Sequence, residues 1–205
     1  MNRGPDAPKI RDATRSDTTT ARAHGSSTSP PTERHAMTLD DRVLRPLTND
    51  DWGFESNCFV CEPRNQSGLR IPFFHDAESR TVVAEFTLDG RFSGAPRYVH
   101  GGVILALLDE AMAWATIAIA QRFAVTAETT TEFGRPVRLD RPHKVRAWIE
   151  ASEGNDLLTA AEIIRDDGVR CATARARFAA LDLEHVSDAT GASIAGPVSD
   201  STAPA

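Results

Sequence analysis

The sequence has fewer basic than acidic residues. Lysine and arginine total 23 against 29 aspartates and glutamates, which gives a formal net charge of −6. Proteins that bind nucleic acid usually carry a basic surplus, so this balance argues against a nucleic-acid partner. The 205 residues are 40% hydrophobic and 25% charged. This composition is typical of a soluble protein with one sizeable core.

Secretion and membrane signals are also lacking. The 3 cysteines are an odd number, and residues 1–30 hold no apolar run that could direct secretion, so a disulfide framework is not expected. The longest apolar stretch, residues 103–120, has Asp109 and Glu110 at its middle. Two carboxylates at mid-depth would be costly in a bilayer. A cytoplasmic protein without membrane contact is therefore expected.

Motifs for several kinds of chemistry are missing. No G-x-S-x-G sequence is present, which excludes the nucleophile elbow of α/β-hydrolases, and there is no glycine-rich loop for phosphates. Cys58 and Cys61 have the spacing of metal ligands, but no second pair follows, so two packed or exposed thiols are the favoured interpretation. We therefore expect neither a metal nor a cofactor.

Composition divides the chain into three parts. Residues 1–36 and 186–205 are rich in small and polar residues and cannot bury enough apolar surface to offset their ordering entropy, so both are expected to be disordered tails. Residues 37–185 between them form one domain. The sequence leaves open whether translation starts at Met1 or Met37.

Hydrophobic periodicity within the domain predicts strands, then one helix, then more strands. Residues 103–121 are apolar on nearly all sides and poor in glycine and proline, which indicates a buried helix. Alternating patterns with turn signals between them predict strands over residues 69–74, 80–88, 125–133, 143–151, 157–165 and 169–181. In the last of these the small residues on one face suggest that a helix packs closely there. One antiparallel sheet wrapped around one central helix accounts for the order, in the α+β class.

The start of that helix carries the candidate site. His100-Gly101-Gly102 precedes it, and a helix N-terminus offers free amide N–H groups that can bind a developing oxyanion. Two glycines that merely let a loop turn are the alternative. Two turns further on, Asp109 and Glu110 lie in the apolar middle, where a carboxylate is costly unless it is paired or used. Adjacent helical positions point about 100° apart, so the two acids should face different surroundings.

Distance predicts a shared site. Gly102 and Asp109 are seven residues apart, or roughly 10 Å along a helix. A carbonyl held at one and attacked through the other requires both within about 3 to 4 Å of the reacting atoms. Two copies related by symmetry can supply the two groups, so we expect a homodimer, with a homotetramer as a further possibility.

The residues Val99 to Ile104, followed by Leu107-Leu108-Asp109, resemble the hotdog-fold acyl-CoA thioesterases of the phenylacetyl-CoA-pathway and mitochondrial types. The resemblance covers roughly residues 58–181. It includes the Cys58 to Cys61 segment with Gly68-Leu69, and a strand from Thr126 to the Arg135-Pro136 pair. It departs at Glu62, where the family usually has glycine.

The resemblance implies the following roles. Asp109 would be the general base or nucleophile, the Gly102 amide would bind the thioester oxygen, and His100 would shape the loop and contact substrate. Thr126 would help to hold the attacking water, with Thr129, Thr130 and Thr131 as alternatives.

Substrate contacts are assigned more loosely. Gly101 leaves room for substrate beside the helix start. Arg135 and Arg138 lie in the densest basic segment, which extends to Arg141, His143 and Lys144 and offers a seat for the phosphates of coenzyme A or simply a solvated loop.

The expected activity is hydrolysis of an acyl-CoA thioester to a carboxylic acid and coenzyme A. A non-catalytic acyl-CoA sensor with the same fold is one alternative. A hotdog hydratase or dehydratase is the other. The sequence does not define the acyl chain, the pathway or the choice between water activation and a covalent route.

Overall fold

The computed structural model describes residues 38–39, 42–52 and 55–191. The predicted N-terminal tail, residues 1–36, lies outside this part of the chain, as do both candidate start positions. So do residues 192–205 of the predicted C-terminal tail.

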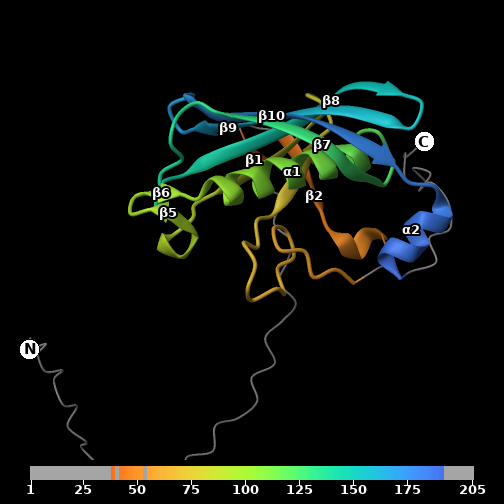
Figure 1. The fold of residues 1–205 in the computed structure, drawn as a ribbon, viewed down its shortest axis with the longest axis horizontal. Coiled ribbons are helices and arrows are strands. Elements are labelled where there is room, and N and C mark those ends of the chain that lie inside the picture. Colours follow the sequence, from red (N-terminus) through yellow and green to blue (C-terminus); the bar gives the residue numbers. More distant parts are fainter. Residues whose placement is uncertain (1–37, 40–41, 53–54, 192–205) are drawn as a thin grey trace, which may run out of the picture. The chain divides into compact units, whose positions relative to one another are not determined.

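One antiparallel sheet forms the body of the domain (Figure 1). Its strand order is β1-β2-β3-β4-β8-β9-β10-β7. The strands span Thr38–Leu39 (β1), Arg42–Leu47 (β2), Phe73–Asp76 (β3), Thr81–Phe86 (β4), Ala124–Phe133 (β7), His143–Glu153 (β8), Asp156–Arg165 (β9) and Arg170–Ala180 (β10). A small two-stranded sheet, β5 (Ser93–Ala95) with β6 (Tyr98–Val99), leads into the central helix α1 (Gly101–Ala118). A 3-10 turn, η1, covers Asn49–Trp52, another, η2, covers Gly90–Phe92, and a short helix, α2, covers Leu183–Thr190.

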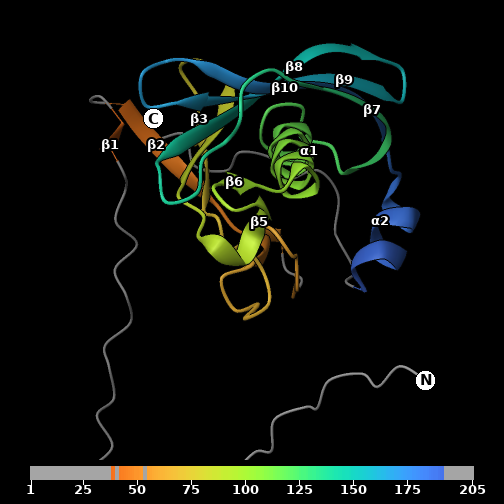
Figure 2. The ribbon, with the colours of Figure 1, turned by 60° about the vertical axis from the view of Figure 1, so that its left-hand side comes forward.

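Helix α1 lies against the concave side of the sheet, which curves over it when the helix is viewed end-on (Figure 2). The inner face of β10 carries Ala172, Ala174 and Ala176, all nearly fully buried. Small side chains allow the helix backbone to approach the sheet, as the alternating pattern predicted. Leu107 and Leu108 on α1 have no exposed surface, so the predicted buried helix is confirmed.

The composition and length of α1 would allow it to cross a membrane. Half of the helix is nevertheless buried inside the domain, where it packs against strands of the sheet. The core helix of a soluble protein has the same composition, and the burial accounts for the apolar character of α1 here.

The alternation predicted for β4 is also confirmed. Val82, Ala84 and Phe86 face α1 and are buried, with Leu88 beyond the strand end. Val83 faces the opposite side and packs with Leu44 and Phe74 in a second, smaller apolar cluster. This outer cluster follows from β2, which the sequence analysis did not predict.

Strand β2 was missed because its sequence, Arg-Val-Leu-Arg-Pro-Leu, contains a proline. Proline has no backbone N–H to donate to a neighbouring strand. It is therefore tolerated at strand positions that have a neighbouring strand on one side only. Strand β1 pairs only with Arg42 and Val43, so Pro46 pairs on one side alone, with Phe74 of β3. Strands β5 and β6 were missed because they are too short to show a period.

The predicted boundary of the C-terminal tail at residue 186 is wrong. Helix α2 continues to Thr190 and buries Val186, which is 2% exposed. Local capping explains the helix: the Asp182 carboxylate accepts a hydrogen bond from the His185 amide at 2.9 Å, and Gly191 ends the helix with φ of 68°. A single apolar residue and two caps left little signal in the composition.

Candidate active site

His100 is the N-cap of α1. Its ring Nδ1 accepts a hydrogen bond from the Gly102 amide at 2.9 Å, and its own amide donates to the Phe92 carbonyl at 2.9 Å. Because Nδ1 is an acceptor, a neutral ring carries its proton on Nε2. His100 is exposed, so that Nε2–H group can face a ligand.

Two glycines pack closely around this cap. A Cβ on Gly102 would lie 3.2 Å from the His100 ring nitrogen, and a Cβ on Gly94 would lie 2.9 Å from the His100 Cα. The second contact is with backbone and cannot relax cheaply. Gly102 stands out in the sequence but Gly94 does not, because the approach of β5 to His100 is a tertiary contact.

The N-cap hydrogen bond of His100 contradicts the expectation for the Gly102 amide. We expected the Gly102 N–H to be free for an oxyanion, but in this structure it donates to His100. The amide becomes available only if the imidazole turns away. The physical reason is that a histidine at the N-cap satisfies an end amide as Ser or Asp would.

Asp109 meets Thr126 at the edge where α1 lies against β7. The Thr126 hydroxyl donates to an Asp109 carboxylate oxygen at 2.8 Å. Among the threonines that the sequence analysis considered, this is the one whose hydrogen bond to Asp109 the structure records. The acid and the hydroxyl therefore meet within one chain, and the role of Thr126 toward the attacking water stays a prediction.

A β-bulge directs Thr126 toward the helix. Along β10, Phe178 pairs with Thr126 and Ala176 pairs with Thr129, so two β7 residues stand opposite the single residue Arg177. Without that extra residue, the alternation that places Thr129 inward would place Ala127 inward and Thr126 outward. The bulge thus puts the hydroxyl on the side of Asp109.

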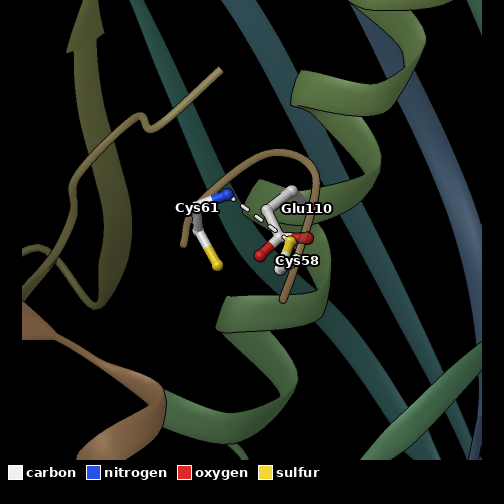
Figure 3. Close-up of side chains that lie close together, drawn as sticks. All are labelled: Cys58, Cys61 and Glu110. Atoms are coloured by element: carbon white, nitrogen blue, oxygen red, sulfur yellow. Dashed lines mark hydrogen bonds between the residues drawn. The ribbon is translucent and has the colours of Figure 1, made fainter. Parts of the chain in front are cut away.

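Glu110 faces a different environment from Asp109, as the 100° rotation between neighbours predicted. Its carboxylate lies close to the thiols of Cys58 and Cys61 (Figure 3). Burial is the main reason that the pKa of Glu110 is raised to about 8, and the nearby Cys58 adds to the effect. The two adjacent acids therefore serve two separate clusters.

The basic segment is divided among several environments. Arg135 and Arg138 are exposed. The backbone of Arg138 forms an isolated antiparallel β-bridge with Tyr98, on the strand that leads into His100. Lys144 forms an ion pair with Glu85 at 3.2 Å. Arg141 is exposed, and its carbonyl lies 3.0 Å from the Nδ1 of His143.

His143 differs from the exposed arginines of this segment. Its side chain is buried and stacks on Phe86 with ring centroids 5.7 Å apart. Burial lowers its pKa, so the ring is neutral at pH 7 and adds no positive charge for a phosphate. Trp114 lies in the core, and Cys171 is a buried free thiol.

This fold and the region of the candidate site are similar to those of known proteins. The profile of the Thioesterase superfamily matches residues 97–172, which contain His100, Gly102, Asp109 and Thr126. A crystal structure of a thioesterase superfamily protein superposes with a TM-score of 0.58 and 27% identity, over 71% of this chain and 70% of that one.

Two proteins of known source are also similar in sequence. The acyl-coenzyme A thioesterase THEM4 of Mus musculus is 30% identical over 118 residues, which are 57% of this chain and 50% of that protein. An uncharacterized protein of Schizosaccharomyces pombe is 28% identical over 121 residues, or 55% of this chain and 69% of that one. The match to the mouse protein thus spans half of its length.

The antiparallel sheet around a central helix is the hotdog fold, and residues 97–172 match the Thioesterase superfamily. The matched region holds the proposed acid and its threonine but not the pair Cys58 and Cys61.

Proposed function

We propose that this protein is an acyl-CoA thioesterase that acts as a homodimer. The observation that carries the proposal is the hydrogen bond from Thr126 to Asp109. A carboxylate on a largely apolar helix, held by a hydroxyl on the adjoining strand, keeps one oxygen oriented and leaves the other for a reactant. The match of residues 97–172 to the Thioesterase superfamily and the similarity to a mouse acyl-CoA thioesterase support the same reaction class.

Asp109 starts the reaction by one of two routes. As a general base it takes a proton from water, whose oxygen attacks the thioester carbon. As a nucleophile its carboxylate attacks directly, and water then opens the resulting anhydride. In both routes the C–S bond breaks, coenzyme A leaves as a thiolate that takes up a proton, and the acyl group departs as a carboxylic acid. Thr126 orients the carboxylate, or the water beside it.

The oxyanion that forms on the thioester oxygen needs a donor at the start of α1. Two groups could donate this hydrogen bond to the oxyanion. One is the Nε2–H of His100 in the present arrangement, and the other is the Gly102 amide after the imidazole turns aside. Gly101 adds no side chain at this point, so substrate can approach the backbone.

Two copies are needed because one helix separates the donor from the acid by roughly 10 Å. The β7 strand offers a surface for the pairing. Among the strands of the described residues it is the last in the sheet and pairs only with β10, and its apolar residues Val125 and Phe133 are 49% and 58% exposed. A long exposed edge strand is prone to pair with another chain. A twofold pairing there would set the two α1 helices beside each other, with Gly102 of one copy toward Asp109 of the other.

Coenzyme A would place its phosphates near the exposed arginines Arg135 and Arg138. Arginine suits phosphate because its planar guanidinium donates two parallel hydrogen bonds. The bridge between Arg138 and Tyr98 holds this segment next to the strand that precedes His100. A local positive patch of this kind is needed because the whole chain is acidic.

The test is release of free thiol from a panel of short, aromatic and long acyl-CoAs by the purified full-length protein. We expect turnover of at least one class and a loss of at least 100-fold in kcat for Asp109→Asn. Asp167→Asn is the matched control, since Asp167 lies in an exposed hairpin and pairs with Arg165. Tight binding of acyl-CoA without thiol release would favour the sensor, and addition of water to an unsaturated acyl-CoA would favour the hydratase.

A further inference from the structure

Three potential metal ligands meet on the side of α1 that Asp109 does not face. The Sγ atoms of Cys58 and Cys61 and a carboxylate oxygen of Glu110 all lie within 4.8 Å of one another (Figure 3). The cysteines come from the loop between η1 and β3, and the glutamate comes from the middle of α1. The sequence analysis found only the cysteine pair, because the third group is about 50 residues away in the chain.

The loop that contains Cys58 and Cys61 already has backbone amides directed at a cysteine sulfur. The amides of Val60 and Cys61 donate to the Cys58 Sγ at 3.3 Å and 3.4 Å. Amide donors favour the thiolate, which is the form of cysteine that binds metals. A hydrogen bond from the Cys61 side chain is the main reason that the pKa of Cys58 is lowered to about 5, and the two amide hydrogen bonds add to the effect.

The rest of the loop is fixed by its own contacts. The Leu69 amide donates to the Phe59 carbonyl at 2.7 Å, and a Cβ on Gly68 would lie 2.5 Å from that carbonyl oxygen. Glu62, the departure from the family pattern, is buried but its carboxylate accepts a 2.6 Å hydrogen bond from Arg64. It is therefore used by the loop itself, and Glu110 supplies the carboxylate at the thiols.

The charges of the three groups oppose one another. Interaction with Cys58 raises the pKa of Cys61, and burial raises that of Glu110. Without a cation the cluster keeps protons on groups that would otherwise ionise. A bound divalent ion would displace those protons and stabilise all three groups as anions.

We propose that Cys58, Cys61 and Glu110 bind one Zn²⁺ ion, with solvent as the fourth ligand. Thiolates select zinc over magnesium or calcium, and carboxylate oxygen is an accepted third ligand. Zn–S bonds of about 2.3 Å at tetrahedral angles place two sulfurs about 3.8 Å apart, within the 4.8 Å limit of this cluster. The ion would fasten the cysteine loop to α1 one residue beyond Asp109. The inference does not depend on the proposed thioesterase activity.

The test is zinc binding by the full-length, reduced and metal-stripped protein, measured in competition with a chromophoric chelator. We expect one equivalent per chain. Cys58→Ser and Cys61→Ser should each weaken binding at least 100-fold, and Glu110→Gln at least 10-fold. Cys171→Ser, a buried thiol elsewhere, and Asp109→Asn, the adjacent carboxylate, should leave the affinity unchanged.

Cobalt substitution of the unmutated protein provides a second readout that needs no variant to fold. Thiolate ligands should give a near-ultraviolet charge-transfer band with one equivalent of Co²⁺. Absence of that band, or zinc affinity that survives both serine variants, would overturn the proposal. So would a reduced protein that takes up no zinc while Cys58 and Cys61 form a disulfide on oxidation, since the pair would then be a redox couple.

Discussion

The Thr126 hydroxyl donates a 2.8 Å hydrogen bond to the Asp109 carboxylate, and so joins the edge strand β7 to the middle of α1. The bulge opposite Arg177 makes this contact possible, because it turns Thr126 inward. The acid is thereby oriented at the rim of the sheet, where a second copy of the chain can reach it.

Replacement of Thr126 should separate orientation from packing. Thr126→Val keeps the shape but removes the donor, and we expect about a 10-fold loss in kcat, equivalent to one hydrogen bond of about 1.4 kcal/mol. Thr126→Ser should recover most of the rate. Thr130→Val, an exposed outer-face position on the same strand, is the control in steady-state thiol-release assays.

His100 should contribute to both stability and catalysis, and two variants can distinguish these contributions. His100→Ala removes the N-cap and should lower the free energy of unfolding by about 1 kcal/mol, measured with urea. His100→Asn keeps a capping acceptor and should restore stability. If the ring also serves the oxyanion, His100→Asn should still lose activity, whereas full activity would assign His100 to capping alone.

A site shared between two copies predicts complementation. Asp109→Asn and an inactive variant at the helix start, such as Gly102→Pro, should be inactive separately. After mixing and subunit exchange, half of the dimers are mixed and each contains one intact site, so about one quarter of the original activity should return. No recovery in verified mixed dimers would place the whole site within one chain.

The small residues beneath α1 should not tolerate enlargement. Ala174 is 3% exposed on the inner face of β10, so Ala174→Leu should destabilise the protein by about 1–3 kcal/mol through overpacking. Arg175→Leu, on the exposed face of the same strand, should change stability by about 0.5 kcal/mol or less. Urea unfolding monitored by circular dichroism measures both, and equal effects would contradict the packing described here.

Glu110 should make the metal-free, reduced protein less stable as pH rises. Its pKa is raised from 4.5 to about 8 in the folded state, mainly by burial. The folded state therefore holds the proton more tightly than the unfolded state, and ionisation between these values costs stability. The thiols of Cys58 and Cys61 lie beside this carboxyl, and the charge of the adjacent Asp109 adds to the rise in its pKa.

The comparison is between the unmodified protein and Glu110→Gln. Their difference in unfolding free energy should be small below pH 4.5 and should grow to about 1 kcal/mol or more, in favour of Glu110→Gln, by pH 8. Saturating zinc should reduce or reverse the difference. A difference that stays flat across this range would show that the carboxyl is not protonated in the folded state.

The sequence alone determined those features that arise from period and local chemistry. Alternation located β4, β7, β8, β9 and β10 to within about three residues, because one face of each strand must match the core. The apolar residues of α1 identified a buried helix, and its two acids were expected to diverge because the helix rotates 100° per residue. Short or capped elements, such as β2 and α2, lacked a period and were missed.

The tertiary structure alone decided which groups meet. Thr126 is turned toward Asp109 by a bulge, and Glu110 joins two cysteines from a distant loop. Neither contact follows from spacing along the chain. Each depends on how the sheet wraps the helix, because only packing brings residues distant in sequence within hydrogen-bond or ligand distance.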